Sequence, residues 1–174
     1  MPASSEWIIK DQTVVSNSWR ILEAEVGVDE LADMEQQAIL APLDFWLAER
    51  STLQARKGLT GVWLDSNEKP GSLIVDSTFD INEIPLIAVN FPVFSDGRGY
   101  STARALRQNL GYEGDLMAIG DVLRDQVFYL KRCGFNILMP RADQDAEIML
   151  TAFADFKTGY QASIDQPEPL FRRR

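Results

Sequence analysis

Short apolar runs alternate with helix-like segments along most of the chain. Five runs are continuous and rich in Ile, Leu and Val, which is typical of strands buried on both faces. Between them, apolar residues recur every three or four positions, as they do on the buried side of a helix. The expected strands cover residues 38–41, 60–64, 84–90, 116–119 and 135–139, and the expected helices cover 43–57, 101–110, 121–133 and 143–161.

Capping and stop residues set the expected ends of these helices. Ser101 or Thr102 can cap the second helix, and Asp121 can cap the third. Pro42 suits the first position of a helix. In the last helix, residues 149, 153, 156 and 160 fall on one apolar stripe. Glycines that can end helices are Gly58, Gly111 and Gly134.

The alternation of strands and helices predicts an α/β fold with a parallel sheet of about five strands. Two arrangements fit, an open doubly wound sheet and a partial (β/α) barrel. A partial barrel leaves an edge and an apolar face uncovered, so it predicts pairing with another chain, as in a homo-oligomer. Residues 1–36 are weakly patterned, with short strands at 7–10 and 19–26. They are predicted to be an N-terminal extension of a single α/β domain at 37–174.

Charge and composition exclude several classes of protein. The 174-residue chain has a formal net charge of −9, which argues against general binding to nucleic acid or to an anionic membrane. It has no histidine, so Ser-His and Cys-His catalytic arrangements are absent. Cys133 is the only cysteine, which excludes an intramolecular disulfide and a thiolate metal cluster within one chain. No apolar stretch approaches 18 residues and no signal pattern opens the chain, so we expect a soluble, cytoplasmic protein.

A polar, glycine-containing loop follows the strand at 84–90 and precedes a helix. In α/β sheets and barrels, such loops lie at the carboxyl ends of the strands, where ligands bind. Arg98, near a helix N-terminus, can hold a phosphate, sulfate or carboxylate. Alternatively, Arg98 pairs with a neighbouring carboxylate and only stabilises this edge. The predicted binding residues are Asn90, Ser95, Asp96, Gly97, Arg98, Gly99, Tyr100, Ser101 and Arg124.

Polar residues after the other strands are expected at the same edge. Asp65 follows the strand at 60–64, and Arg141 and Asp143 follow the strand at 135–139. Asp121 and Asp125 are one helical turn apart and are the predicted catalytic residues, acting as general base or acid. They can instead be a helix cap and an acid that is favourable beside the helix dipole.

The segment 97–102 also comes close to the dinucleotide-binding pattern G-x-G-x-x-G. Thr102 replaces its third glycine, and the loop follows a middle strand rather than the first. Nucleotide binding is therefore a weakly supported alternative.

Four motifs resemble a bacterial family of unknown function: Phe91–Ser101, Gly120–Gln126, Tyr129–Phe135 and Tyr160–Gln161. Members of that family are labelled as oxidoreductases of sulfite reduction, and their genes tend to lie beside those for sulfite reductase and adenylylsulfate reductase. The resemblance covers roughly residues 38–174. It implies a pathway, but it defines no catalytic residues and no cofactor.

Two hypotheses about function follow. In the first, the protein is an accessory or electron-delivery protein that acts with sulfite reductase, and its acidity steers it to a basic patch on the partner. In the second, it is an enzyme or binder for a small oxyanion such as sulfite, sulfate or phosphate, with Arg98 and Arg124 as an anion clamp. A flavin- or nicotinamide-dependent reductase is a third possibility that rests on the family label. An iron–sulfur cluster needs several thiolates, and this chain has one.

Overall fold

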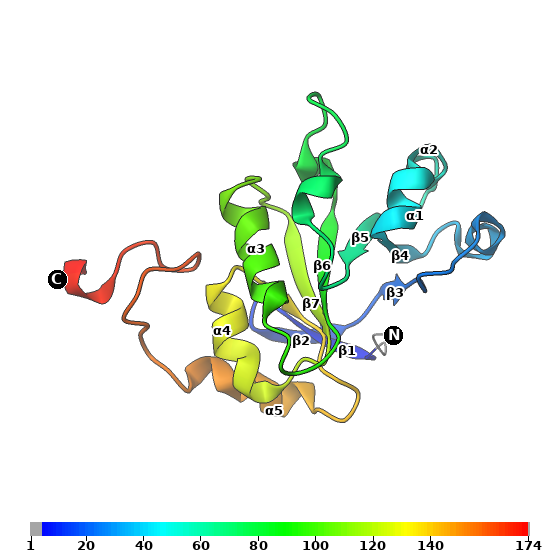
Figure 1. The fold of residues 1–174 in the computed structure, drawn as a ribbon. Helices are drawn as coiled ribbons and strands as arrows, with labels where there is room; N and C mark the ends of the chain where they lie inside the picture. The colour runs from blue at the N-terminus through cyan, green and yellow to red at the C-terminus, as the bar shows by residue number, and fades with distance from the viewer. Residues whose placement is uncertain (1–4, 174) are drawn as a thin grey trace.

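An eight-stranded sheet forms the centre of the molecule (Figure 1). The structure is a computed structural model that describes residues 5–173. The strands are β1 (Trp7–Lys10), β2 (Thr13–Ser16), β3 (Trp19–Ile21), β4 (Ala38–Pro42), β5 (Thr60–Leu64), β6 (Leu86–Phe91), β7 (Asp115–Gly120) and β8 (Ile137–Leu138). Their order in the sheet is β2-β1-β8-β7-β6-β5-β4-β3.

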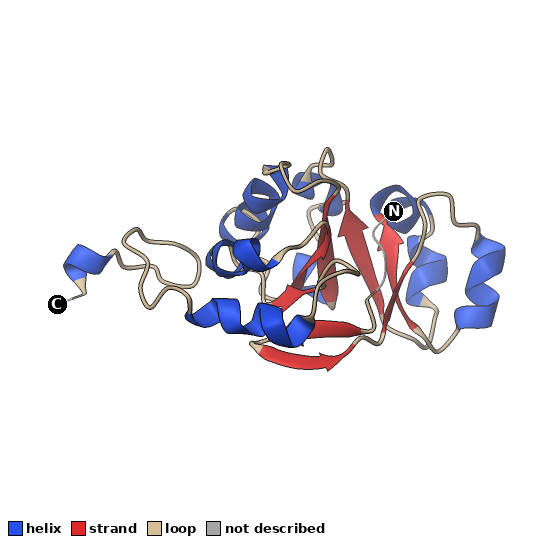
Figure 2. Cartoon of the chain, turned by 90° about the horizontal axis from the view of Figure 1, so that it is seen from below, coloured by secondary structure: helices blue, strands red, loops and turns tan. Residues whose placement is uncertain are grey.

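Most helices of the described chain are short, and they pack against one face of the sheet (Figure 2). The α-helices are α1 (Leu43–Ala48), α2 (Arg50–Gln54), α3 (Arg98–Gln108), α4 (Val127–Arg132) and α5 (Ala146–Thr151). Turns of 3-10 helix are η1 (Val28–Met34), η2 (Pro70–Leu73), η3 (Ile81–Glu83), η4 (Arg124–Gln126), η5 (Ala152–Ala154) and η6 (Leu170–Arg172). Among residues 5–173, no helix combines the length and the apolar character that a membrane span requires.

The strand order decides between the two predicted arrangements. Strands β3 to β8 are parallel, and each strand from β4 to β8 lies beside the strand that precedes it in the chain. A doubly wound sheet reverses its order at one point, so that alternative is wrong. The sheet instead curls into a half-barrel (Figure 2). It is also mixed rather than five-stranded and parallel, because β1 pairs antiparallel with β8 and β2 pairs antiparallel with β1.

The two edges of the sheet are consecutive in the sequence. Only Asn17 and Ser18 separate β2, at one edge, from β3, at the other. Three extended residues span at most about 11 Å, so this short connection requires strong curvature. The Asn17 side chain donates to the Ser5 carbonyl at 3.0 Å, and the Trp19 N–H donates to Asn17 Oδ1 at 3.0 Å.

The face of the sheet that points away from the helices has its own core. It includes Trp63, whose indole N–H donates to the Leu22 carbonyl at 3.0 Å. Residues of the first strands cover this face, so the expectation of an uncovered apolar face is wrong, and the argument it gave for pairing with another chain is removed. The buried residues are Ile8, Leu40, Trp63, Leu86, Ala88, Met117, Ile119, Ile137 and Met139, with Val15, Trp19 and Ile21 packed against them.

The predicted helix at 43–57 is wrong as a single element, because the chain breaks into α1 and α2. Glu49 separates them with φ −110° and ψ 24°, outside helical geometry. Its carboxylate accepts a hydrogen bond from the Thr52 hydroxyl at 3.2 Å but caps no backbone N–H of α2.

Other predicted helix starts are corrected too. α3 begins at Arg98 because Asp96, not Ser101 or Thr102, accepts the first free N–H, at 3.1 Å. α4 begins at Val127 rather than near Asp121, whose carboxylate is bound elsewhere. The predicted stops at Gly111 and Gly134 are confirmed, with φ of 66° and 103°.

The last helix is much shorter than predicted. α5 begins after Asp145, whose side chain accepts from the N–H groups of Glu147 and Ile148, and its 3-10 extension ends at Ala154. Phe156 and Tyr160 therefore lie beyond the helix and are exposed. The predicted apolar stripe is real only at Met149 and Phe153.

Candidate functional site

A group of charged and polar side chains gathers where four parallel strands end, and we call it the rim. These residues follow β5, β6, β7 and β8, whose carboxyl ends meet at one edge of the sheet. The rim consists of Asp65, Ser66, Asn90, Asp96, Arg98, Asp121, Arg141 and Asp143.

Arg98 connects the loop after β6 to the loop after β5. Its guanidinium pairs with the Asp96 carboxylate at 2.6 Å and donates to the Ser66 hydroxyl at 2.8 Å. Hydrogen bonds from Arg98 hold the pKa of the Asp96 carboxyl well below its usual range. Since Asp96 also accepts the Arg98 N–H, the protein's own carboxylate lies at the N-terminus of α3.

A second set of contacts joins β5 to β6 through buried polar groups. The amide of Asn90 is 8 % exposed and donates to Asp65 Oδ1 at 3.0 Å. Its Oδ1 accepts no hydrogen bond from the described residues and lies against Gly120. Glu68 accepts the Asp65 N–H at 2.5 Å, and burial together with the carboxylates of Asp44 and Asp65 raises the pKa of Glu68.

Asp121 connects the loops after β6, β7 and β8. One carboxylate oxygen accepts the Phe94 N–H at 2.7 Å, and the other accepts from Arg141 at 2.6 Å. Arg141 also binds Asp143 at 2.6 Å, and these two carboxylates raise the pKa of Arg141. Each oxygen of Asp121 therefore already accepts one hydrogen bond, and these two contacts fix the orientation of the carboxylate.

The two glycines that flank Arg98 have different roles. A Cβ atom on Gly99 would lie 2.6 Å from the Phe91 ring, so this glycine allows α3 to pack closely on β6. A Cβ on Gly97 would meet nothing closer than 3.9 Å. Close packing on β6 therefore explains why residue 99 is a glycine in this near match to the dinucleotide pattern. A bound phosphate is not needed to explain it.

Tyr100 and Ser101 point to different surroundings. The Tyr100 ring packs edge-on against Phe91 and Tyr129, with centroids 5.1 and 4.8 Å apart, and burial raises its pKa. Ser101 instead borders an open cavity on the outer side of the rim. Ser95 is exposed, and its side chain makes no hydrogen bond with another described residue.

Arg124 and Asp125 make no hydrogen bond or ion pair with the rim residues in the described part of the chain. The Arg124 guanidinium binds Asp155 and the Thr151 hydroxyl, at 3.0 and 3.2 Å. Arg98 binds Asp96 and Ser66 instead, so the two arginines of the predicted clamp have separate partners. Asp125 is exposed, and no hydrogen bond joins it to Asp121 in residues 5–173.

The cavity beside the rim has a volume of about 390 Å³. It lies between the loop after β5 and the first turns of α3. Two cationic side chains, Lys69 and Arg98, border it, together with the single carboxyl group of Glu68. Three hydroxyl residues complete its polar border: Ser66, Ser101 and Thr102. This chemistry suits a small anion.

Cys133 lies at the end of α4 in a second, smaller cavity of about 220 Å³ that Tyr129 and Arg132 also line. The side chain is half-buried, and burial raises the pKa of its thiol. A thiol with a raised pKa is a weak nucleophile.

Sequence reasoning missed Ser66, Glu68 and Lys69. All three lie within five residues of the end of the predicted strand at 60–64. This position at a strand end was the signal that could have identified them. It also missed a basic cavity around Arg50, at the opposite ends of the strands. There the signal was the spacing of Trp46 and Arg50, which lie one helical turn apart.

Within the part of the chain that the structure describes, no three acidic or cysteine side chains are placed to hold a metal ion together. The fold and the rim together define an α/β protein whose sheet is a curled half-barrel. Hydrogen bonds and ion pairs connect the charged side chains at one edge of this sheet. The chain belongs to the family described as "Bacterial protein of unknown function (DUF934)", whose model matches residues 61–171. No curated protein matches the chain.

Proposed function

We propose that this protein is a cytoplasmic accessory protein of assimilatory sulfite reduction that docks on sulfite reductase and assists its assembly or electron supply. The pathway comes from the resemblance carried by the motifs at 91–101, 120–126 and 129–135. Docking is supported by one observation, an exposed aromatic arm at the C-terminal end.

The arm comprises residues 155–173 and extends away from the sheet (Figure 1). Three of its aromatic side chains are largely exposed: Phe156 at 61 %, Tyr160 at 67 % and Phe171 at 58 %. Exposed aromatic residues in one segment are typical of protein interfaces. Its last residues add a run of arginines, a residue type that is also enriched at interfaces.

Hydrogen bonds give the arm a defined shape. The Ile164 N–H donates to the Arg132 carbonyl at 3.1 Å, and Arg132 donates to the Gln161 carbonyl at 2.5 Å, which fastens the arm to the end of α4. Further out, the Leu170 N–H donates to the Tyr160 carbonyl at 3.0 Å. A segment that is already ordered loses less entropy when it binds.

The test is binding of the purified, cofactor-free protein to purified sulfite reductase at low salt. We expect saturable binding that weakens at high salt, because an acidic chain approaches a basic patch. Replacing Tyr160 and Phe171 together by Ser should weaken binding by about tenfold or more, since aromatic residues carry much of the binding energy of interfaces. Ile148→Ser, which alters an equally exposed side chain outside the arm, should bind as the unaltered protein does.

No binding at low salt would refute the proposal. Equal binding by the arm variant and the Ile148 variant would show that the arm is not the docking surface.

A second candidate function, binding of a small oxyanion, is supported by the cavity beside Arg98. Sulfite, sulfate or phosphate in that cavity would meet the guanidinium and Lys69. Titration calorimetry with these anions should show millimolar or tighter binding that Arg98→Ala abolishes. If Arg98→Ala binds as well as the unaltered chain, this candidate fails.

A further inference from the structure

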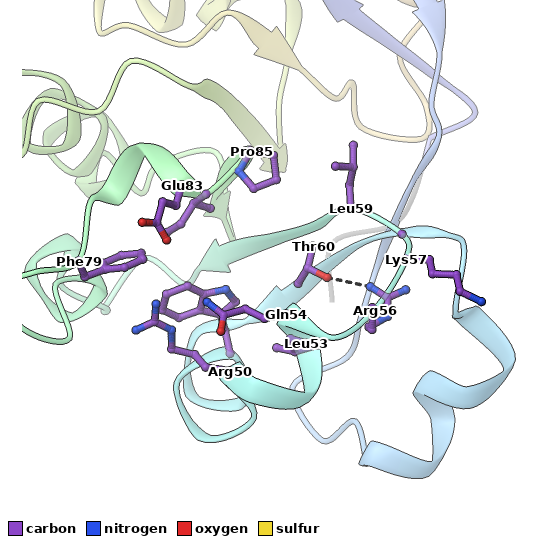
Figure 3. A pocket seen from close by; sticks show the side chains of 13 residues that line it. Arg50, Leu53, Gln54, Arg56, Lys57, Leu59, Thr60, Phe79, Glu83 and Pro85 are labelled. Carbon is purple, nitrogen blue, oxygen red and sulfur yellow. Dashed lines mark hydrogen bonds between the residues drawn. The ribbon is translucent and has the colours of Figure 1, made fainter.

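A basic cavity lies at the opposite ends of the strands from the rim. It has a volume of about 340 Å³ and is bordered by α2, the loop after it and the segment around η3 (Figure 3). Thr60, the first residue of β5, and Pro85, which directly precedes β6, are both in its wall. The cavity is therefore separate from the arm and from the rim. Its volume falls within the range of small-molecule sites.

Arg50 is held in this cavity by two aromatic rings. Its guanidinium carbon is 4.3 Å from the ring centre of Phe79 and 4.9 Å from that of Trp46. Trp46 is only 6 % exposed, so its ring is a firm support. Within residues 5–173, the guanidinium makes no hydrogen bond or ion pair. Its N–H groups are thus positioned by stacking and still available to an acceptor.

The charges around Arg50 favour an anion. Arg56 and Lys57 add two cations to the wall, against the single carboxylate of Glu83. Arg56 contributes a positive charge to the cavity but fewer free N–H donors. Its guanidinium already donates to Thr60 Oγ1 and to the Gln37 carbonyl, both at 2.8 Å. In a chain with a net charge of −9, a concave basic region concentrates anions locally.

Two carboxylates outside the cavity wall, those of Glu35 and Asp76, reduce this effect without cancelling it. Lys57 pairs with Glu35 at 3.1 Å, although both side chains are largely exposed. Hydrogen bonds from Thr78 lower the pKa of the Asp76 carboxyl, and Arg50 is close enough to lower it further. Among the described residues, no hydrogen bond or ion pair joins Asp76 to Arg50, so this carboxylate does not occupy the donors of Arg50.

Much of the remaining wall is hydrocarbon. Leu53 and Ile84 in this wall are buried, while Leu59 is 58 % exposed. Figure 3 shows Leu53, Leu59 and Pro85 around the cavity. Pro85 adds an apolar surface beside them. A bare inorganic ion would leave these surfaces in contact with water, whereas an organic body would cover them.

We propose that this cavity binds a small organic anion. Its carboxylate or phosphoryl group meets the N–H edge of Arg50, and its apolar body lies against Leu53, Leu59 and Pro85. The two head groups share the same recognition chemistry, which is a planar, bidentate contact with guanidinium.

Titration calorimetry with four probes tests this proposal: benzoate, phenyl phosphate, inorganic phosphate and benzyl alcohol. We expect saturable binding of benzoate or phenyl phosphate. Binding should be at least about tenfold weaker for inorganic phosphate, which lacks the apolar body, and for benzyl alcohol, which lacks the charge. A preference between the two aromatic anions then identifies the head group. Absence of saturable binding of both up to about 10 mM would overturn the proposal.

Substitutions locate the binding. Arg50→Gln should weaken the preferred probe by at least about tenfold, and Arg50→Lys by less, since lysine keeps the charge but not the planar fork. The matched control Arg104→Gln alters an exposed arginine on α3 and should bind as the unaltered chain does. Undiminished binding by Arg50→Gln would refute the site.

A second variant covers the case in which Arg50→Gln fails to fold. Leu59→Asp leaves Arg50 and its supporting rings in place and adds a negative charge to an exposed position in the wall. We expect the same loss of anion binding, with an unchanged circular dichroism spectrum. Full binding by this variant would place the anion elsewhere.

Discussion

Asp96 determines how α3 begins. It accepts the Arg98 N–H at 3.1 Å and pairs with the Arg98 guanidinium at 2.6 Å. The helix N-terminus that was predicted to attract an external anion thus already has a carboxylate from its own chain. An incoming oxyanion would share Arg98 with Asp96, so we place it in the cavity on the far side of Arg98.

The low pKa of Asp96 predicts a specific response to acid. Its pKa in the folded protein lies below the unfolded value of about 3.9. The carboxylate therefore stabilises the fold above about pH 4, and this contribution is lost as pH falls towards the folded-state pKa. Asp96→Asn should lower stability at pH 7 and show a shallower decline from pH 5 to pH 3, measured by urea unfolding.

Asp125→Asn is the control for this change, since Asp125 is exposed and makes no recorded hydrogen bond in residues 5–173. It should follow the pH profile of the unaltered protein. A profile for Asp96→Asn that runs parallel to the unaltered one would contradict the assignment.

Gly99 gives a second prediction at the scale of one residue. A methyl group there would lie 2.6 Å from Phe91 Cζ, inside van der Waals contact. Gly99→Ala should cost about 1–3 kcal/mol in the free energy of unfolding, the usual range for an overpacked core. Gly71→Ala, where a Cβ meets nothing within 4 Å, should have little effect.

Adding Phe91→Leu to Gly99→Ala tests the cause, because the smaller side chain makes room for the methyl group. If the double variant is less stable than the sum of the two single changes predicts, crowding against Phe91 is not the reason.

At the scale of elements, buried strands are the best-predicted part of the chain. The runs at 38–41, 60–64 and 116–119 each became a strand with nearly the expected bounds. Their composition predicts burial, because the side chains of Ile, Leu and Val are apolar and are usually found in the protein interior. Helix ends were predicted less well, because they depend on which side chain reaches a free N–H, as at Asp96 and Asp145.

The start of α5 shows how much one cap contributes. Asp145 Oδ1 accepts the N–H groups of Glu147 and Ile148 at 2.8 and 3.1 Å. Asp145→Ala should therefore destabilise the protein by about 0.5–2 kcal/mol in urea unfolding. Asp145→Asn, which keeps an acceptor oxygen, should lose little. Equal losses in both variants would assign the effect to charge and not to capping.

The whole sheet could be predicted only in part. Five strands in parallel succession follow from the alternation of apolar runs and helices, whereas β3 was assigned to an N-terminal extension. β2 was missed because its four residues are partly exposed on both faces. The pairing of β1 with β8 leaves no local trace in the sequence, since it joins opposite ends of the chain.

Prediction of the candidate site was similarly partial. Several predicted residues meet at the rim because parallel strands end at one edge, a rule that needs no side-chain detail. That Asp121 binds Arg141, and Arg124 binds Asp155, depends on how the loops turn after the strands. Neither the catalytic nor the binding assignment is tested by this geometry, and both stay predictions.

Trp63 connects the N-terminal strands to the rest of the molecule. Its indole N–H binds the Leu22 carbonyl, next to β3. Trp63→Phe should leave that carbonyl without its donor and cost about 1–3 kcal/mol. Amide exchange should accelerate at Leu22 more than in β6 if the loss is local. Trp7→Phe, at a half-exposed position, should change neither measurement.

The pairing of the N-terminal hairpin with β8 has a consequence for how the protein folds during its synthesis. The β1–β2 hairpin leaves the ribosome long before β8, yet Ile9 pairs with Leu138. Throughout most of translation, the hairpin has no neighbouring strand, and the inner face of the half-barrel has no cover. Pairing over such a separation is slow, so we expect docking of this hairpin to be the last step after synthesis. A nascent chain halted before residue 137 should therefore expose Trp63 and depend on chaperones.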